Sequence, residues 1–181
     1  MTRKINLFSL KGGQGVSTTV VLLANSFALQ GRSVLLLDHK GGDLSALLGT
    51  TDPIVGVAKE VTDNITLLVQ GADENLTHGF DVVISDLGYF VEGAENLLVT
   101  QPCYMALRQA SREIELVEKC DGAIIVRPAD RCLTDEDVAN VLAVKHINTI
   151  MMDASIARAS DAGVLASARR HHLSIDLPTT V

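Results

Sequence analysis

The chain has 181 residues, of which 47% are hydrophobic and only 3% aromatic, and its formal net charge is −7. This length and apolar content predict a single domain, residues 1–181, with a core of aliphatic side chains. The acidic balance argues against a surface devoted to nucleic acid, so any contact with DNA would have to be local.

The cysteines and the apolar runs exclude other classes of protein. Cys103, Cys120 and Cys132 are odd in number and lack C-x-x-C spacing, which argues against a disulfide framework or a zinc site, so we expect reduced thiols that are buried or partly buried. The opening M-T-R-K has no apolar signal core behind it, and no apolar run approaches the roughly 18–20 residues of a membrane span. We therefore expect a cytoplasmic protein without a membrane partner.

The first elements along the chain surround a glycine-rich turn. The apolar run over residues 5–10 predicts a buried strand, and residues 20–29, apolar almost all round, predict a helix covered on both sides. Between them lies S-L-K-G-G-Q-G-V-S-T-T, residues 9–19. Glycines at this place allow positive φ and bring backbone N–H groups against an anion at a helix N-terminus. The stretch is therefore predicted to be a phosphate-binding loop.

The loop keeps most of the groups that a phosphate requires. Ser17 stands where a hydroxyl would hold Mg²⁺, but the usual pattern G-x-x-x-x-G-K-[ST] has a lysine just before that hydroxyl, and here the residue is Val16. A lysine remains at Lys11, ahead of the first glycine pair. The candidate nucleotide-binding residues are Lys11, Gly12, Gly13, Gln14, Gly15, Val16, Ser17 and Thr18.

This loop resembles the deviant Walker A motif, K-G-G-x-G-(K)-[ST]-T, of the ParA/MinD family. In that family the lysine at the place of Lys11 reaches across a nucleotide-sandwich dimer to the partner's phosphates. The resemblance therefore implies ATP or ADP with Mg²⁺ as the cofactor and a homodimer as the assembly. The alternative is a glycine-rich strand-to-helix turn with a surface lysine.

The next strand, residues 33–38, ends in Asp38. Its continuation, D-H-K-G-G-D-L-S-A-L-L-G, resembles a family segment in which a second aspartate positions or activates the attacking water, and here Lys40 stands at that second position. Asp43 is predicted to cap a short helix that continues to Leu48. The resemblance thus implies that the hydrolytic carboxylate is missing.

Two further strands are predicted over residues 64–69 and 80–86, the second running into Asp86. This strand resembles a Walker B strand, whose carboxylate orders the Mg²⁺ shell, usually through water. Because parallel strands bring their carboxyl ends to one edge of a sheet, Ser17, Asp38 and Asp86 are expected to meet there as the Mg²⁺ site.

The second half of the chain continues the alternation of strands and helices. The predicted elements are strands over residues 96–100, 122–127 and 147–152, a helix over residues 104–119 with an apolar stripe of Leu107, Ala110, Ile114 and Val117, and a helix through about Val144 that is capped by Thr134 and Asp137. In relatives the sixth strand often ends in Asn-Arg, where the asparagine reads the adenine ring, but Arg127 and Pro128 stand here. Base recognition is therefore in doubt.

The late segment D-A-S-I-A-R-A-S-D-A-G also resembles the family, which extends the resemblance over nearly the whole chain. A final helix carries Arg169, Arg170, His171 and His172, which would either touch DNA phosphates or simply be cations at an exposed helix end. The tail lacks the basic amphipathic helix by which MinD holds membranes. The fold class expected is α/β: a doubly wound, mainly parallel seven-stranded sheet with helices on both faces, the P-loop NTPase fold.

The two departures from the family pattern bear on function. Losing the loop lysine removes a charge-assisted contact worth about 1.5–3 kcal/mol, or roughly 10–100-fold in affinity, so nucleotide binding would be weakened but not abolished. Without that lysine and the water-positioning carboxylate we expect little or no ATP hydrolysis. We hypothesise that Lys40 turns inward to replace the lost charge; the alternative is a lysine that points to solvent.

Three functions are compatible with these residues. The first is a ParA/MinD-like partition or positioning protein that dimerises with nucleotide and recruits a protein partner or cargo adaptor. The second is a non-catalytic scaffold of the TadZ/CpaE type, with a vestigial nucleotide pocket. The third, an ATP-using ligase or synthetase of the cobyrinate or dethiobiotin type, is disfavoured because those enzymes need the loop lysine, and no additional acid/base cluster is visible.

Overall fold

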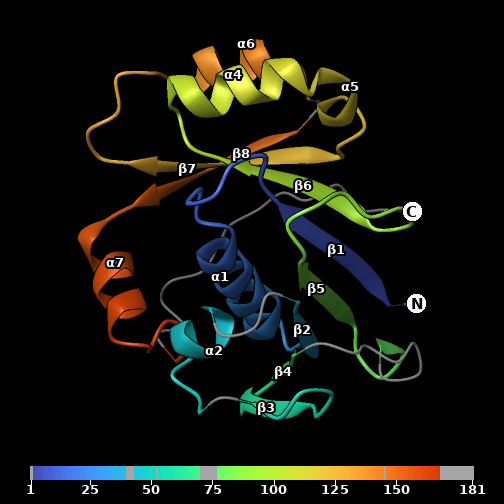
Figure 1. Cartoon of the computed structure of the whole chain (residues 1–181). Coiled ribbons are helices and arrows are strands. Elements are labelled where there is room, and N and C mark those ends of the chain that lie inside the picture. The colour runs from blue at the N-terminus through green and yellow to red at the C-terminus, as the bar shows by residue number, and fades with distance from the viewer. Residues whose placement is uncertain (1, 40–42, 52, 70–76, 145, 168–181) are drawn as a thin grey trace.

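The computed structural model describes residues 2–39, 43–51, 53–69, 77–144 and 146–167. Within these ranges the strands form one sheet in the order β3-β4-β2-β5-β1-β6-β7-β8 (Figure 1). Their bounds are β1 Arg3–Phe8, β2 Val34–Asp38, β3 Lys59–Thr62, β4 Ile65–Val69, β5 Val82–Asp86, β6 Glu95–Thr100, β7 Gly122–Pro128 and β8 Ile147–Met152. All neighbouring strands are parallel except β3 and β4, which are antiparallel.

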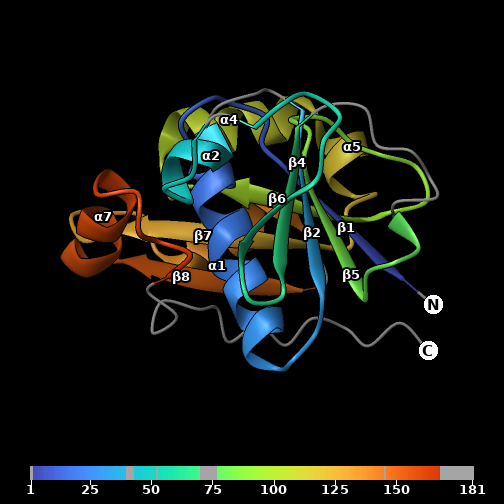
Figure 2. The same cartoon turned by 90° about the horizontal axis from the view of Figure 1, so that it is seen from below.

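Helices cover both faces of this sheet (Figures 1 and 2). One face carries α1 (Val16–Leu29), α2 (Asp43–Leu47) and α7 (Ala154–Asp161), and the other carries α4 (Tyr104–Arg112), α5 (Ile114–Val117) and α6 (Asp135–Leu142). The fold is therefore α/β with a doubly wound, mainly parallel sheet, as predicted.

Alternation along the strands explains how one sheet supports two cores. On β6, Leu97 and Val99 pack into the core that contains α1, whereas Leu98 packs into the core that contains α4 and α6. Each of these side chains is almost completely buried, because a strand directs successive residues to opposite faces. Continuous apolar runs are what a parallel sheet covered on both faces requires.

Helix α1 is buried nearly all round, as its apolar sequence predicted. Its residue Asn25, fully buried, donates a hydrogen bond from Nδ2 to the backbone oxygen of Leu165 at 3.0 Å. This bond ties the helix to the segment that follows α7. The carboxyl end of β1 therefore leads into a helix that is buried over most of its length.

The sequence predicted seven strands, and the described residues contain those seven and one more. The additional strand, β3, reads K-E-V-T, pairs with β4 at the edge of the described sheet and has an irregular register between Glu60 and Thr62. A short polar strand at a sheet edge buries little, so it lacks the apolar pattern by which the others were found.

The predicted helix over residues 104–119 is divided into α4 and α5 at Glu113. The N–H group of Glu113 is shared between the carbonyls of Gln109 and Ala110, at 3.1 and 3.2 Å, a tightening that is common where a helix ends. The predicted apolar stripe survives this break, since Leu107, Ala110 and Val117 are buried.

Two further expectations can be compared with the structure. All three cysteines are free, but Cys132 is exposed rather than partly buried, because it lies in the loop that follows β7. Burial and the neighbouring Asp121 raise the pKa of Cys120 to about 12, so this thiol stays protonated. Among the helices in the described ranges, none combines the length and the apolarity that crossing a bilayer requires.

Candidate functional site

The predicted phosphate loop connects β1 to α1 by a turn that only glycine accommodates easily. Gly13 and Gly15 have φ values of 75° and 88°, and Gly15 is the residue immediately before α1. Thr19 fixes the helix start, since its N–H and its hydroxyl both donate to the Gly15 oxygen, at 2.9 and 2.8 Å. The Ser9 hydroxyl donates to the oxygen of Lys11 at 2.9 Å. The turn is thus held at both ends by its own hydroxyl groups.

Ser17 and Asp86 meet beneath this turn. The Ser17 hydroxyl donates to Oδ2 of Asp86 at 2.6 Å, a short distance typical of a bond to an ionised carboxylate. Asp86 is paired in register with Asp38 on the neighbouring strand β2, and each carboxylate residue is only 1% exposed. One hydroxyl and two carboxylates are oxygen donors of the kind that Mg²⁺ prefers.

His39, which the sequence interpretation did not single out, belongs to the same region. Burial lowers its pKa below the ordinary value of 6.5, although the negative charges of Asp38 and Asp86 oppose that shift. Near neutral pH the ring is therefore neutral and adds no positive charge to the site. Its position directly after Asp38 was the one signal in the sequence that could have drawn attention to it.

The surface in front of the loop is hollowed, with a volume of about 410 Å³. The loop residues form one wall, and Asp43, Ala46 and Leu47 of α2 form another. A side chain added at Gly12 or Gly13 would meet only open space. In the described part of the chain no three His, Cys, Asp or Glu side chains gather as a metal cluster, so a cation here would depend on waters and on its ligand for most of its coordination.

The remaining candidate residues have different surroundings. Lys11 is exposed, Thr18 is half-buried, and Val16 is 7% exposed with its side chain in the core cluster. The side chain of Gln14 is also buried, and its Oε1 accepts a hydrogen bond from the N–H of Gln101 at 2.9 Å. Gln101 was not among the predicted site residues.

Some of the predictions concern residues outside the described ranges. These are Lys40, which was predicted to stand at the place of the second aspartate, and the basic residues Arg169, Arg170, His171 and His172. Both hypotheses, an inward-pointing lysine and a contact with DNA phosphates, remain predictions.

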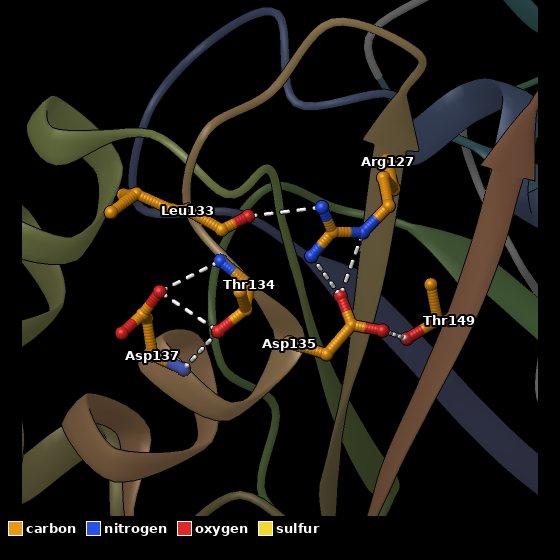
Figure 3. A network of polar contacts seen from close by, with 6 residues as sticks. All are labelled: Arg127, Leu133, Thr134, Asp135, Asp137 and Thr149. Atoms are coloured by element: carbon orange, nitrogen blue, oxygen red, sulfur yellow. Dashed lines mark hydrogen bonds and ion pairs between the residues drawn. The ribbon is translucent and has the colours of Figure 1, made fainter.

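Arg127, at the end of β7, is held by residues of its own chain (Figure 3). Its Nε and Nη2 donate to Oδ1 of Asp135, and its Nη1 donates to the Leu133 oxygen at 2.9 Å. Oδ2 of Asp135 in turn accepts from the hydroxyl of Thr149 on β8 at 2.8 Å. These contacts, together called the Arg127 latch, occupy the guanidinium group and fix the loop that leads into α6.

The predicted cap of α6 is present beside this latch. Thr134 Oγ1 accepts from the N–H of Asp137, and Asp137 Oδ2 accepts from the N–H of Thr134, which is a capping box (Figure 3). The hydrogen bonds from the backbone and side chain of Thr134 lower the pKa of Asp137. The helix ends at Leu142, two residues earlier than predicted, because Ala143 adopts the left-handed conformation.

Comparison with known proteins bears directly on the predicted family. No protein-family model matches the chain. The septum site-determining protein MinD of Synechocystis sp. is 28% identical, over 90% of this chain and 81% of its own length. Among solved structures, MinD of Pyrococcus horikoshii, complexed with Mg-ADP, has a TM-score of 0.77 at 22% identity and covers 94% of this chain and 89% of its own. In the MinC:MinD cell division complex of Aquifex aeolicus, the matched chain has a TM-score of 0.73 at 20% identity, covering 93% and 95%.

The structural similarities establish the fold, and the sequence match extends over most of both chains. Together with the phosphate loop that first indicated the relationship, they bear out the predicted resemblance to the ParA/MinD family.

Proposed function

We propose that the chain is a ParA/MinD-like positioning or partition protein for which a magnesium nucleotide is a dimerisation ligand, with little or no hydrolysis. The observation that carries this proposal is the contact of Ser17 with Asp86, with Asp38 in register beside it, directly beneath an open glycine turn. A hydroxyl and two carboxylates at one edge are the oxygen ligands that Mg²⁺ prefers, and a purely structural turn would not require them there.

The residues present fit a magnesium nucleotide. The N–H groups at the start of α1 and the partial positive charge of its N-terminus favour phosphate, and the hollow of about 410 Å³ lies against them. Ser17 would hold the metal directly, with Asp38 and Asp86 acting mostly through water. Bound Mg²⁺ would supply the positive charge that offsets the phosphates. The Mg-ADP in the related MinD of Pyrococcus horikoshii supports this assignment.

Weak binding and slow chemistry follow from what the loop lacks. Val16, at the usual lysine position, has its side chain in the core, so the described part of the loop offers only the exposed Lys11 as a cation. Losing one charge-assisted contact weakens affinity roughly 10–100-fold. Without a group at position 16 to stabilise transition-state charge, turnover would fall by roughly 10²–10³ or more.

Lys40 is the residue that would compensate for this loss. If its ammonium group contacts the phosphates, Lys40→Ala weakens nucleotide affinity about 10-fold or more, because a charge-assisted contact disappears. Lys4→Ala, a matched change of an exposed lysine on β1, leaves affinity unchanged. Equal affinities for Lys40→Ala and the unchanged chain would show that Lys40 points to solvent.

Exposed apolar side chains near the strands' carboxyl ends support association across this face. Among the described residues, seven large apolar side chains are more than half exposed and lie at or next to such an end: Ile54, Val55, Val57, Tyr89, Tyr104, Met105 and Met151. Apolar surface that gathers at one edge favours burial by another protein surface. A second copy of the chain is the proposed occupant, and the MinC:MinD complex of Aquifex aeolicus supports a further protein partner.

The second candidate function is a scaffold of the same fold whose nucleotide pocket is vestigial. The burial of Val16 favours it, because an apolar side chain packed into the core stands where the usual lysine would contact phosphate. The two functions differ in one respect: only the first requires nucleotide to change the assembly, since a ligand shifts an equilibrium only when it prefers one state.

Light-scattering mass with and without Mg-ATP separates these candidates. The proposed switch predicts a monomer without nucleotide and a dimer of twice the 19.3 kDa chain mass at saturating Mg-ATP. Lys11→Ala should retain nucleotide binding but lose the dimer, as the family resemblance implies for this lysine. A mass that does not respond to millimolar Mg-ATP would overturn the switch and leave the scaffold.

A further inference from the structure

Three hydrogen bonds connect the phosphate loop to two other loops through one residue, Gln101. The backbone N–H of Gln101, directly after β6, donates to Oε1 of Gln14 at 2.9 Å. Its side-chain Nε2 donates to the backbone oxygen of Gly13 at 3.0 Å, and its Oε1 accepts from Nη2 of Arg131 at 3.1 Å. Arg131 lies in the loop between β7 and α6. The ends of three strands are therefore joined in series.

The contact with Gly13 constrains the part of the loop that would face phosphate. Gly13 has a φ of 75° and open space where a side chain would be, so sterics alone leave it free to rotate. Because a peptide unit is planar and trans, fixing the direction of the Gly13 oxygen also fixes the direction of the Gln14 N–H. The bond from Gln101 thus orients one backbone donor of the loop, and the buried Gln14 side chain anchors the same peptide from its other end.

Arg131 determines which way the Gln101 amide points. A guanidinium group only donates, so it selects the amide orientation with Oε1 toward Arg131 and Nε2 toward Gly13. The reversed orientation would set two donors against each other at Arg131 and two acceptors against each other at Gly13. Arg131 is exposed and outside the phosphate site, on the wall of a groove between α4 and α6.

We propose that Gln101 is a positioning residue of the phosphate loop and that Arg131 acts through it. The loop is then ordered by Gln101 and Arg131, neither of which lines the hollow in front of it. The consequence for nucleotide affinity rests on the proposed function, whereas the effect on loop order does not. The two can therefore be measured separately.

The direct test is ¹⁵N relaxation of the full chain without nucleotide, with variants chosen by their contacts. Gln101→Met keeps the side-chain volume but removes both polar groups, and Arg131→Met removes the orienting donor. Arg108→Met is the matched control, because Arg108 is also an exposed arginine on the wall of the same groove but does not contact Gln101. Arg131→Lys restores a donor and should rescue part of the effect. Thermal melts confirm that each variant is folded.

The expected result concerns the order parameters of the N–H groups of Gly13, Gln14 and Gly15. They should be about 0.85 in the unchanged chain and in Arg108→Met, and should fall toward about 0.6 in Gln101→Met, with Arg131→Met between them. Order parameters that stay the same in Gln101→Met would overturn the proposal.

Mg-ATP titration of the same variants gives the second readout. Gln101→Met should weaken binding about 3–10-fold, as expected for the one lost hydrogen bond to the phosphate loop, and Arg108→Met should not change it. If the unchanged chain binds no nucleotide, the proposed function fails, and the relaxation data still decide whether Gln101 orders the loop. If binding is present but equal in Gln101→Met and the unchanged chain, the relay does not govern affinity and that part of the proposal is wrong.

Discussion

The ends of β1 and β5 and the end of β7 lie on the same edge of the sheet but use their polar side chains differently. Behind the phosphate loop, Ser17 and Asp86 meet beneath an open glycine turn, and the surface in front of it is hollow. At β7 the guanidinium of Arg127 is occupied by Asp135 and the Leu133 oxygen. At the phosphate loop the edge of the sheet is open to a ligand. At the end of β7 the guanidinium group of Arg127 is already bound within the chain.

This difference shows that the fold can form while part of the sheet edge that could bind a ligand is occupied by the chain's own side chains. Substitutions in the phosphate loop that keep its backbone conformation should change mainly ligand affinity. Substitutions of Arg127 and its partners should change mainly the free energy of unfolding. The difference also agrees with the doubt about base recognition that Arg127 and Pro128 raised in the sequence. Four predictions follow, beginning with the largest expected effect, and those for Val16 and Arg127 test this division.

Gly15→Val should abolish detectable nucleotide binding and lower the free energy of unfolding by about 2–4 kcal/mol. The φ of 88° is strained for a β-branched residue, and a Cβ there would already approach Cγ1 of Val126 to 3.3 Å. Urea denaturation and calorimetric titration measure the two effects. Gly31→Val is the matched control, since Gly31 has a similar φ of 76° with open space around it and lies at the far end of α1. It should cost only about 1–2 kcal/mol and leave any binding intact.

Val16→Lys should strengthen Mg-ATP binding about 10–100-fold, because it restores a charge-assisted phosphate contact at the N-terminus of α1. Val16→Met, which adds length without charge, should have no such effect. Calorimetry measures both variants. Equal affinities in the two would mean that the loop does not hold phosphate in the way proposed.

Arg127→Met should lower the free energy of unfolding by about 1–3 kcal/mol, because it breaks hydrogen bonds to Asp135 and to the Leu133 oxygen. Thr149→Val removes only the outer bond to Asp135 and should cost about 0.5–1.5 kcal/mol. Nucleotide affinity should change less than 2-fold in both. A large loss of affinity with little loss of stability would contradict the division between the phosphate loop and Arg127.

The smallest effect is expected from His39→Gln, as a change in the pH dependence of stability. Since burial lowers the pKa of His39, the unfolded chain takes up more protons than the folded one below the ordinary value of 6.5. The neutral His39 ring therefore makes its full contribution to the free energy of unfolding above pH 6.5, and this contribution is lost as the pH falls from 6.5 toward the folded-state pKa. Urea denaturation between pH 7.5 and 5 should show a shallower fall for His39→Gln, and parallel curves would disprove the assignment.

The elements that the sequence predicted correctly are those whose signals are local. Apolar runs that end in Asp38 and Asp86 marked two central strands, and the spacing of Thr134 and Asp137 marked a capping box that is present. The glycine turn was placed correctly between β1 and α1 because strand, glycines and helix follow one another directly.

What the sequence did not predict depends on contacts between distant segments. Gln14 and Gln101 are 87 positions apart, and no pattern in either segment indicates that they pair. The polar edge strand β3 buries too little apolar surface to leave a periodic signal in the sequence. The break at Glu113 left no signal either, because the apolar stripe continues from α4 into α5. The single domain, the cytoplasmic location and the role of each site residue remain predictions.

Calorimetric titration of Mg-ATP into the unchanged chain and into Ser17→Ala tests the central claim most directly. The proposed phosphate site predicts measurable binding in the micromolar range that requires Mg²⁺ and weakens about 10-fold or more in Ser17→Ala, because that variant loses the hydroxyl between Asp86 and the metal. Absence of heat at millimolar Mg-ATP, or equal affinity in Ser17→Ala, would contradict the claim that this end of the sheet holds a magnesium nucleotide.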